Sequence, residues 1–159
     1  MDSHETDAVM RDAHAAIGGF IARCSLLDYR VSQFVARWFC VHEKQKLLAY
    51  TLKAMPFAEK RQVIEERLSK WHDDPAALSV VMSGIAAVLE RRNLVASGVL
   101  SRRSSGVLCI KSFSAARFLS EVGAIDILDI SELAEMSERA SELAVRMVAL
   151  GLGLKDSAS

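Results

Sequence analysis

The feature that most constrains the fold is a run of apolar residues at alternating steps of three and four between Met10 and Trp38. Its members are Met10, Ala13, Ile17, Phe20, Cys24, Leu27, Val31, Phe34 and Trp38. Because an α-helix has about 3.6 residues per turn, this spacing places all of them on one face of a single long helix. Gly18–Gly19 lowers helix propensity without shifting the register, so we expect a bend or a close helix contact there. This apolar face requires a partner, which is either the last helix of the same chain or a second copy of the chain.

Three more helices with apolar faces are expected before residue 99. The second spans about Glu43 to Met55, with its inward residues at Leu47, Leu48, Leu52 and Met55. Pro56 blocks its continuation, and helical spacing restarts through Phe57, Lys60, Ile64, Leu68 and Trp71. A turn at Asp73-Asp74-Pro75 begins the fourth helix, which stops at Gly98, a residue suited to a left-handed cap.

The remainder of the chain combines a hairpin with a final helix. Short β-prone runs at Val99–Leu100 and Val107–Ile110 predict a β-hairpin, and Phe113 to Leu119 is expected to form a helical turn. A capping sequence at residues 129–132 precedes a last helix that carries apolar residues from Leu133 to Leu150 and ends at Gly151.

These elements predict an all-α protein in which residues 1–159 form a single domain. Four main helices form an up-and-down bundle with a shorter helix or turn, and the small β-hairpin is inserted before the last long helix.

Composition limits the partners of such a domain. The 20 basic and 20 acidic side chains cancel, which excludes a generally basic nucleic-acid-binding coat and confines any anion binding to a local site. The 51% hydrophobic content is high for a soluble domain and favours a homodimer. No run approaches the length of a membrane span and no signal peptide is recognisable, so we expect a cytoplasmic protein that does not contact the membrane.

No cofactor or metal site is expected. Cys24, Cys40 and Cys109 are odd in number and widely spaced among apolar neighbours, which suits reduced core thiols better than disulfides or zinc ligands. A glycine-rich phosphate loop, paired cysteines and a nucleophile elbow are all absent from the sequence, so the conventional enzyme classes have no support.

The most unusual polar residue is Arg92, in the segment Arg91 to Gly98 that closes the fourth helix. It continues an apolar stripe that consists of Leu78, Met82, Ile85 and Leu89. Burying an unpaired charge costs several kcal/mol, so the guanidinium needs a carboxylate, the backbone or a ligand such as phosphate. Around the long first helix, Arg23, Arg30 and Arg37 flank the apolar face on one side and Asp28 on the other.

The layout of the first hundred residues resembles bacterial HEPN-like proteins. The similarity rests on the long opening helix from Ile17 to Tyr29, the segment Met55 to Arg61 and a helix that ends in Arg-Asn-x-x-Ala. Several members of that family are helical ribonuclease toxins or defence factors, with a motif of arginine followed four to six residues later by histidine. The resemblance assigns the motif arginine to Arg92 and the asparagine after it to Asn93.

The motif histidine is missing, because Ser97 stands in its usual place and no histidine follows Arg92. The resemblance implies metal-independent RNA cleavage in which histidine transfers protons while arginine holds the scissile phosphate. A serine hydroxyl is not a usable base at neutral pH, whereas arginine binds phosphate without transferring a proton. We therefore expect a site that holds an anion better than it cleaves one.

Each candidate residue also has an ordinary structural interpretation. Arg92 binds a phosphate or forms an ion pair with Asp28, which would also orient it toward a ligand. Asn93 and Ser97 are remnants of a catalytic site or polar residues at a helix end. Arg91, Arg102 and Arg103 form a basic rim around the motif or a solvated surface, and His42 and His72 are weak candidates for a replacement base.

Three functions remain open. The first is a catalytically degenerate HEPN-like domain that binds RNA, a nucleotide phosphate or a protein partner such as an antitoxin, in bacterial defence or a toxin-antitoxin system. The second is a weak metal-independent ribonuclease that takes its base from elsewhere. The third is a purely structural dimerisation or interaction domain.

Overall fold

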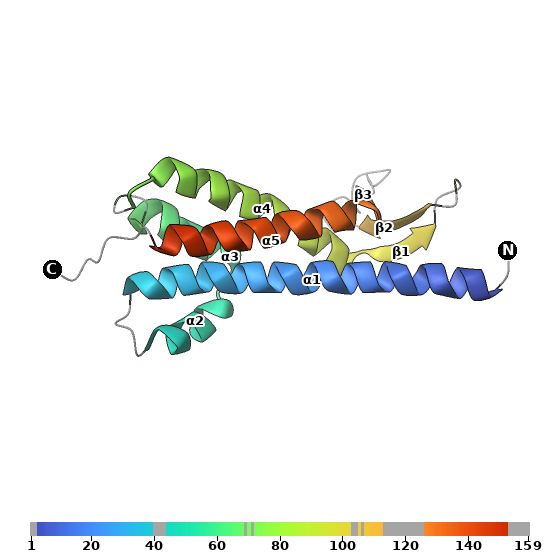
Figure 1. Cartoon of the computed structure of the whole chain (residues 1–159), viewed down its shortest axis with the longest axis horizontal. Coiled ribbons are helices and arrows are strands. Elements are labelled where there is room, and N and C mark those ends of the chain that lie inside the picture. The colour runs from blue at the N-terminus through green and yellow to red at the C-terminus, as the bar shows by residue number, and fades with distance from the viewer. Residues whose placement is uncertain are drawn as a thin grey trace, which may run out of the picture. The chain divides into compact units, whose positions relative to one another are not determined.

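A computed structural model describes residues 3–39, 44–68, 70, 72–102, 105, 107–112 and 126–152. Its helices are α1 (Ser3–Phe39), α2 (Gln45–Lys53), α3 (Phe57–Val63), the π-helical turn η2 (Ile64–Leu68), α4 (Pro75–Ser97) and α5 (Glu132–Leu152). Its strands are β1 (Val99–Arg102), β2 (Leu108–Ser112) and β3 (Asp126–Asp129). The mostly helical fold with a small antiparallel sheet before the last helix is confirmed (Figure 1). The helical turn predicted at Phe113–Leu119 lies outside the described residues.

The fold contains two compact units. The first consists of Met1–Cys24 and Val88–Arg139, and the second of Ser25–Ala87 and Ala140–Ser159. Helices α1, α4 and α5 each contribute residues to both units. No helix in the described part of the chain is long and apolar enough to cross a membrane.

The apolar face of α1 is buried by the chain itself. Phe20 and Cys24 are at most 1% exposed in the first unit, and Leu27 and Val31 are completely buried in the second. The last helix packs against α1, so the two apolar helix faces meet within one chain (Figure 1). This face is therefore part of the core and not a free dimer surface, and the homodimer remains a prediction.

The first unit contains the predicted hairpin and one strand that the prediction missed. Strand β2 pairs antiparallel with β1, and β3 pairs antiparallel with the other edge of β2. The buried residues of the sheet are Cys109, Ile110 and Leu128. The sequence Asp129–Glu132 was interpreted only as a helix start, but Asp129 also ends β3, directly before α5.

Gly98 separates α4 from β1 for a reason that differs from the expected one. Its backbone does not adopt the left-handed conformation of a glycine cap. A β-carbon at this position would instead overlap Cγ2 of Ile110 and lie 2.8 Å from the carbonyl oxygen of Leu94. Glycine is required because the sheet approaches the end of α4 so closely.

Gly18 and Gly19, unlike Gly98, have room for a side chain. Helix α1 continues through both, and a β-carbon at either would meet none of the described neighbouring atoms within 4 Å. The close helix contact predicted for this pair is therefore wrong.

The second unit contains α2, α3 and η2 between its portions of the long helices. Pro56 precedes α3 and Pro75 is the first residue of α4, as the sequence predicted. Two details of the prediction were wrong. Leu47 is 71% exposed, whereas Ala49 is buried in α2. Gly151 does not end α5, because it lies inside that helix, in contact distance of Phe34 and Arg37.

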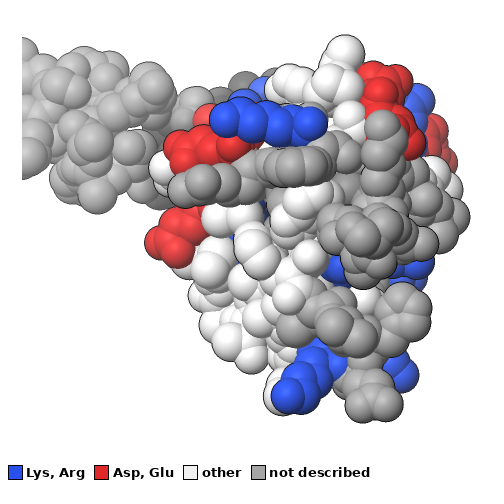
Figure 2. Space-filling model, turned by 90° about the vertical axis from the view of Figure 1, so that its left-hand side faces the viewer, with Lys and Arg blue, Asp and Glu red and all other residues white. Residues whose placement is uncertain are grey.

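Uncharged residues occupy a broad area at the end of the molecule that carries α2, with charged side chains toward its edges (Figure 2). Several large apolar side chains of the second unit are exposed, namely Leu47, Tyr50, Val80, Val145 and Val148.

An ion pair lies in the core of the second unit. The Lys60 side chain is completely buried, and its Nζ donates a hydrogen bond of 2.8 Å to Oδ1 of Asp28, which is 19% exposed. Lys60 was expected on the inward face of its helix because it continues the spacing from Phe57 to Ile64. A buried ammonium without a partner is strongly unfavourable, so the carboxylate on α1 determines where α3 packs.

We expect Asp28→Asn to lower the free energy of unfolding by about 2–3 kcal/mol, because it leaves the Lys60 ammonium buried beside a neutral amide. Replacing both partners, as in Asp28→Leu with Lys60→Met, should cost less than Asp28→Asn alone. The matched control is Arg61→Gln, which breaks an exposed pair with Glu65 and should change stability by no more than about 0.5 kcal/mol. Urea unfolding measures all three, and equal effects of Asp28→Asn and Arg61→Gln would contradict the assignment.

Two glycine substitutions should change the stability of the protein in opposite directions. Gly98→Ala places a methyl group against Ile110 and the backbone of α4, and should destabilise the protein by about 1–3 kcal/mol. Gly18→Ala adds a methyl group in open space on a helix and should stabilise it by about 0.5–1 kcal/mol. Thermal unfolding of the two variants checks this, and a neutral Gly98→Ala would show that the sheet does not press on the end of α4.

Candidate functional site

Arg92 lies at the polar end of the stripe that the sequence predicted on α4. The stripe residues Leu78, Met82, Ile85 and Leu89 are all buried, with exposures of 4% or less. Arg92 itself is half-buried, one helical turn beyond Leu89. Its aliphatic part thus continues the apolar face while the side chain keeps access to solvent.

The charged group of Arg92 acts on a buried thiol in the same unit. Burial raises the pKa of Cys24 to about 11, and the positive charge of Arg92 opposes this rise. Cys24 is 1% exposed and is a free thiol, as is the buried Cys109, which confirms the prediction of core thiols for these two. Cys40 lies outside the described residues. The guanidinium therefore stands near an uncharged group that cannot compensate its charge at neutral pH.

The structure shows another partner for Asp28, which the sequence offered as a possible ion-pair partner of Arg92. Arg92 and Asp28 belong to different units, so an ion pair between them stays a prediction. The cation that holds the Asp28 carboxylate is Lys60, which is more deeply buried than Arg92 and so depends more strongly on a carboxylate. Within the part of the chain that the structure describes, no hydrogen bond or ion pair occupies the Arg92 guanidinium.

Asn93 and Ser97 lie on the exposed side of the end of α4. The Ser97 hydroxyl donates a hydrogen bond of 2.8 Å to the carbonyl oxygen of Asn93, one turn earlier in the helix. This is the common back-bond of serine inside a helix, and it directs the hydroxyl proton to the backbone. Ser97 therefore serves its own helix end and offers no proton acceptor comparable to imidazole.

The structure describes two of the three arginines for which the sequence left open a basic rim or a solvated surface. Arg91 on α4 and Arg102 at the end of β1 are both exposed in the first unit, and Arg103 lies outside the described residues. Exposed arginines of this kind raise the local positive potential without forming a pocket of their own.

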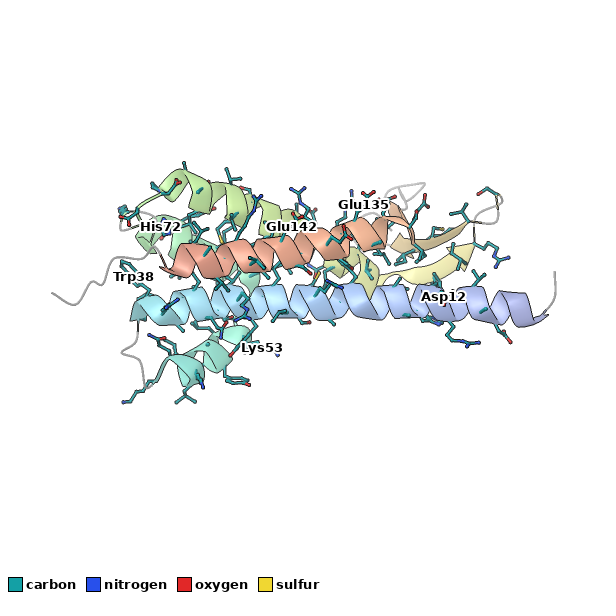
Figure 3. All side chains as sticks on the ribbon, in the orientation of Figure 1. Asp12, Trp38, Lys53, His72, Glu135 and Glu142 are labelled. Atoms are coloured by element: carbon teal, nitrogen blue, oxygen red, sulfur yellow. The ribbon has the colours of Figure 1, made fainter. Side chains whose placement is uncertain are left out.

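His72 has a structural role in the second unit. Its Nδ1 accepts a hydrogen bond of 2.9 Å from the backbone N–H of Asp74, so Nε2 carries the proton and donates to the Leu150 carbonyl, 3.0 Å away. The ring lies beside the C-terminal end of α5 (Figure 3) and contacts Phe34. Since both ring nitrogens are engaged, His72 is poorly suited to act as a replacement base. The other candidate, His42, lies outside the described residues.

Comparison with known proteins found no matching family model, no matching curated protein and no matching solved structure. The described residues also contain no cluster of His, Cys, Asp and Glu side chains that could hold a metal ion. The assignment of a site therefore depends on the geometry of this chain alone.

A second group of cations was visible in the sequence but was given no role. Arg30 and Arg37 were placed beside the apolar face of α1, and the structure brings both to a cavity that Lys46 of α2 also lines. The seven-residue spacing of the two arginines indicates that they lie on the same face of α1, whereas the approach of α2 could not be derived from sequence.

We expect the Cys24 thiol to resist alkylation by iodoacetamide at neutral pH and to become reactive when the protein unfolds, because the thiolate is the nucleophile. The folded pKa of about 11 exceeds the ordinary value of 9.0, so the contribution of Cys24 to stability is complete below pH 9 and is lost between pH 9 and 11. Arg92→Gln should raise the pKa of Cys24 further. Peptide mass spectrometry separates Cys24 from the other cysteines, and alkylation of native Cys24 as fast as in the unfolded chain would contradict this.

Proposed function

We propose that this chain is a HEPN-like helical module that binds a phosphate of RNA at Arg92 and does not cleave it efficiently. The observation that carries the proposal is the state of Arg92, which is half-buried, next to a neutral thiol, and without a carboxylate partner among the described residues. A bacterial defence or toxin-antitoxin setting, with an antitoxin or other protein partner, follows from the resemblance alone.

Phosphate is the ligand that best fits an arginine in this situation. The planar guanidinium presents several donors in a fixed fork that matches phosphate oxygens, and charge-assisted hydrogen bonds of this kind are among the strongest in proteins. Arg91 and Arg102 are exposed in the same unit and add positive charge to a chain whose net charge is zero. Such a local site suits a few phosphate contacts rather than an extended nucleic-acid interface.

Binding without efficient cleavage is supported by what surrounds Arg92. The residue in the place of the motif histidine, Ser97, donates its proton to its own helix, and His72 uses both ring nitrogens within the second unit. General acid and base groups contribute about a hundred- to ten-thousand-fold to a rate, so a site without them cleaves RNA slowly.

The test is binding of a fluorescein-labelled single-stranded RNA, measured by fluorescence anisotropy over a range of salt concentrations. We expect Arg92→Gln to weaken binding about ten- to a hundredfold, the loss of one charge-assisted contact, and to reduce the salt slope by about one. Arg146→Gln removes an exposed arginine from α5 in the second unit and should leave the affinity unchanged. Circular dichroism confirms that both variants fold.

Two outcomes would contradict the proposal. Equal RNA affinity of the Arg92→Gln variant and the wild-type protein would show that Arg92 does not bind the RNA. Rapid cleavage of the RNA, lost in Arg92→Gln and dependent on pH with a histidine-like midpoint, would instead support the alternative of a metal-independent ribonuclease.

A further inference from the structure

The cavity lined by Arg30, Arg37 and Lys46 has a volume of about 280 Å³ and lies in the second unit. Helix α1 contributes Arg30, Gln33, Phe34 and Arg37 to its wall, α2 contributes Gln45, Lys46 and Ala49, and α5 contributes Met147, Val148 and Gly151. Small-molecule sites begin at about 300 Å³, so the cavity has the size of a small metabolite.

The charged residues of this wall are all basic. Arg30, Arg37 and Lys46 line the cavity, and no Asp or Glu is among its described lining residues. Nη1 of Arg30 donates a hydrogen bond of 2.7 Å to Oε1 of Gln33, a neutral amide that orients the guanidinium but does not compensate its charge. The structure shows no ion pair for Arg37 or Lys46 within its described residues.

The cavity also has apolar lining residues. Val148 of α5 is 41% exposed and presents its side chain to a ligand, whereas Phe34, Ala49 and Met147 are each at most 2% exposed and add almost no accessible surface. The cavity thus combines hydrogen-bond donors for an anion with an accessible apolar side chain.

From this arrangement we infer that the cavity binds a small organic phosphate, with the phosphate at Arg30, Arg37 and Lys46 and an apolar part against Val148. Three like charges around one cavity repel each other, and an anion that binds among them relieves this repulsion. Val148 favours a ligand with an apolar group over inorganic phosphate, because only the former covers this exposed apolar side chain. A nucleoside monophosphate combines both parts in a molecule of suitable size.

This site is independent of the RNA site proposed at Arg92, which belongs to the other unit. The two proposals therefore fail separately. Arg92→Gln should leave binding in the cavity unchanged, and variants of the cavity should leave the contribution of Arg92 to RNA binding unchanged.

The test is isothermal titration calorimetry with AMP, inorganic phosphate and adenosine, supported by thermal unfolding in the presence of each. We expect saturable AMP binding that raises the melting temperature, weaker binding of phosphate and still weaker binding of adenosine. Arg37→Gln and Lys46→Gln should each reduce the affinity for AMP about tenfold or more, since each removes a charge-assisted contact. Both residues are exposed, so neither substitution threatens the fold. Arg146→Gln on the exposed side of α5 is the matched control and should bind AMP normally.

Three outcomes would overturn the inference. The first is no saturable binding of AMP or phosphate at millimolar concentrations. The second is that the wild-type protein and the variants Arg37→Gln and Lys46→Gln bind AMP with equal affinity. The third is adenosine or inorganic phosphate binding as tightly as AMP, which would show that the cations and Val148 do not act together.

Discussion

The structure depends on covering the apolar face of α1, a helix of 37 residues. No single partner can cover so long a face in a chain of this size, and each of the two compact units buries its own part of it. Burial of large apolar side chains contributes about 1.5–3 kcal/mol each, so residues such as Phe20, Leu27 and Val31 set the position of everything packed on them. The positions of the charged groups follow from this packing. Cys24 faces the end of α4 with Arg92, and Arg30 and Arg37 lie where α2 and α5 approach α1.

Charge compensation is distributed unevenly over this core. Asp28 neutralises Lys60, the most deeply buried cation among the described residues. Arg92, Arg30, Arg37 and Lys46 have no such partner in the described structure, although the chain as a whole is neutral. Of these four, Arg92 and Arg30 are half-buried. Stability alone does not require them without a carboxylate, because leucine or methionine would fill the same space at lower cost. These two arginines are therefore the main support for the proposed anion sites, one in each unit.

Helical periodicity was sufficient to predict the architecture, because α1, α4 and α5 carry long apolar faces and prolines mark the starts of α3 and α4. It also offered Asp28 as one possible partner of an inward-facing cation, although for Arg92 and not for Lys60. Periodicity could not show which of Arg92 and Lys60 pairs with Asp28, because both residues continue an apolar stripe. Only tertiary packing determines which of the two side chains is buried. The role of Gly98 and the third strand were missed for a similar reason, since both depend on contacts between segments far apart in the sequence. Leu47 continued the expected pattern but is exposed, because α2 is short and is buried mainly through Ala49 and Leu52.

The RNA site proposed at Arg92 has one premise, which is that Asp28 pairs with Lys60 and leaves Arg92 available to a ligand. Double-mutant cycles test this most directly, with the free energies of unfolding measured in urea for Asp28→Asn, Lys60→Met, Arg92→Gln and the two combinations that contain Asp28→Asn. We expect a coupling energy above about 1 kcal/mol between Asp28 and Lys60, and additivity within about 0.5 kcal/mol between Asp28 and Arg92. Strong coupling of Asp28 to Arg92 would show that the arginine is a structural ion-pair partner and would contradict its role as a phosphate ligand.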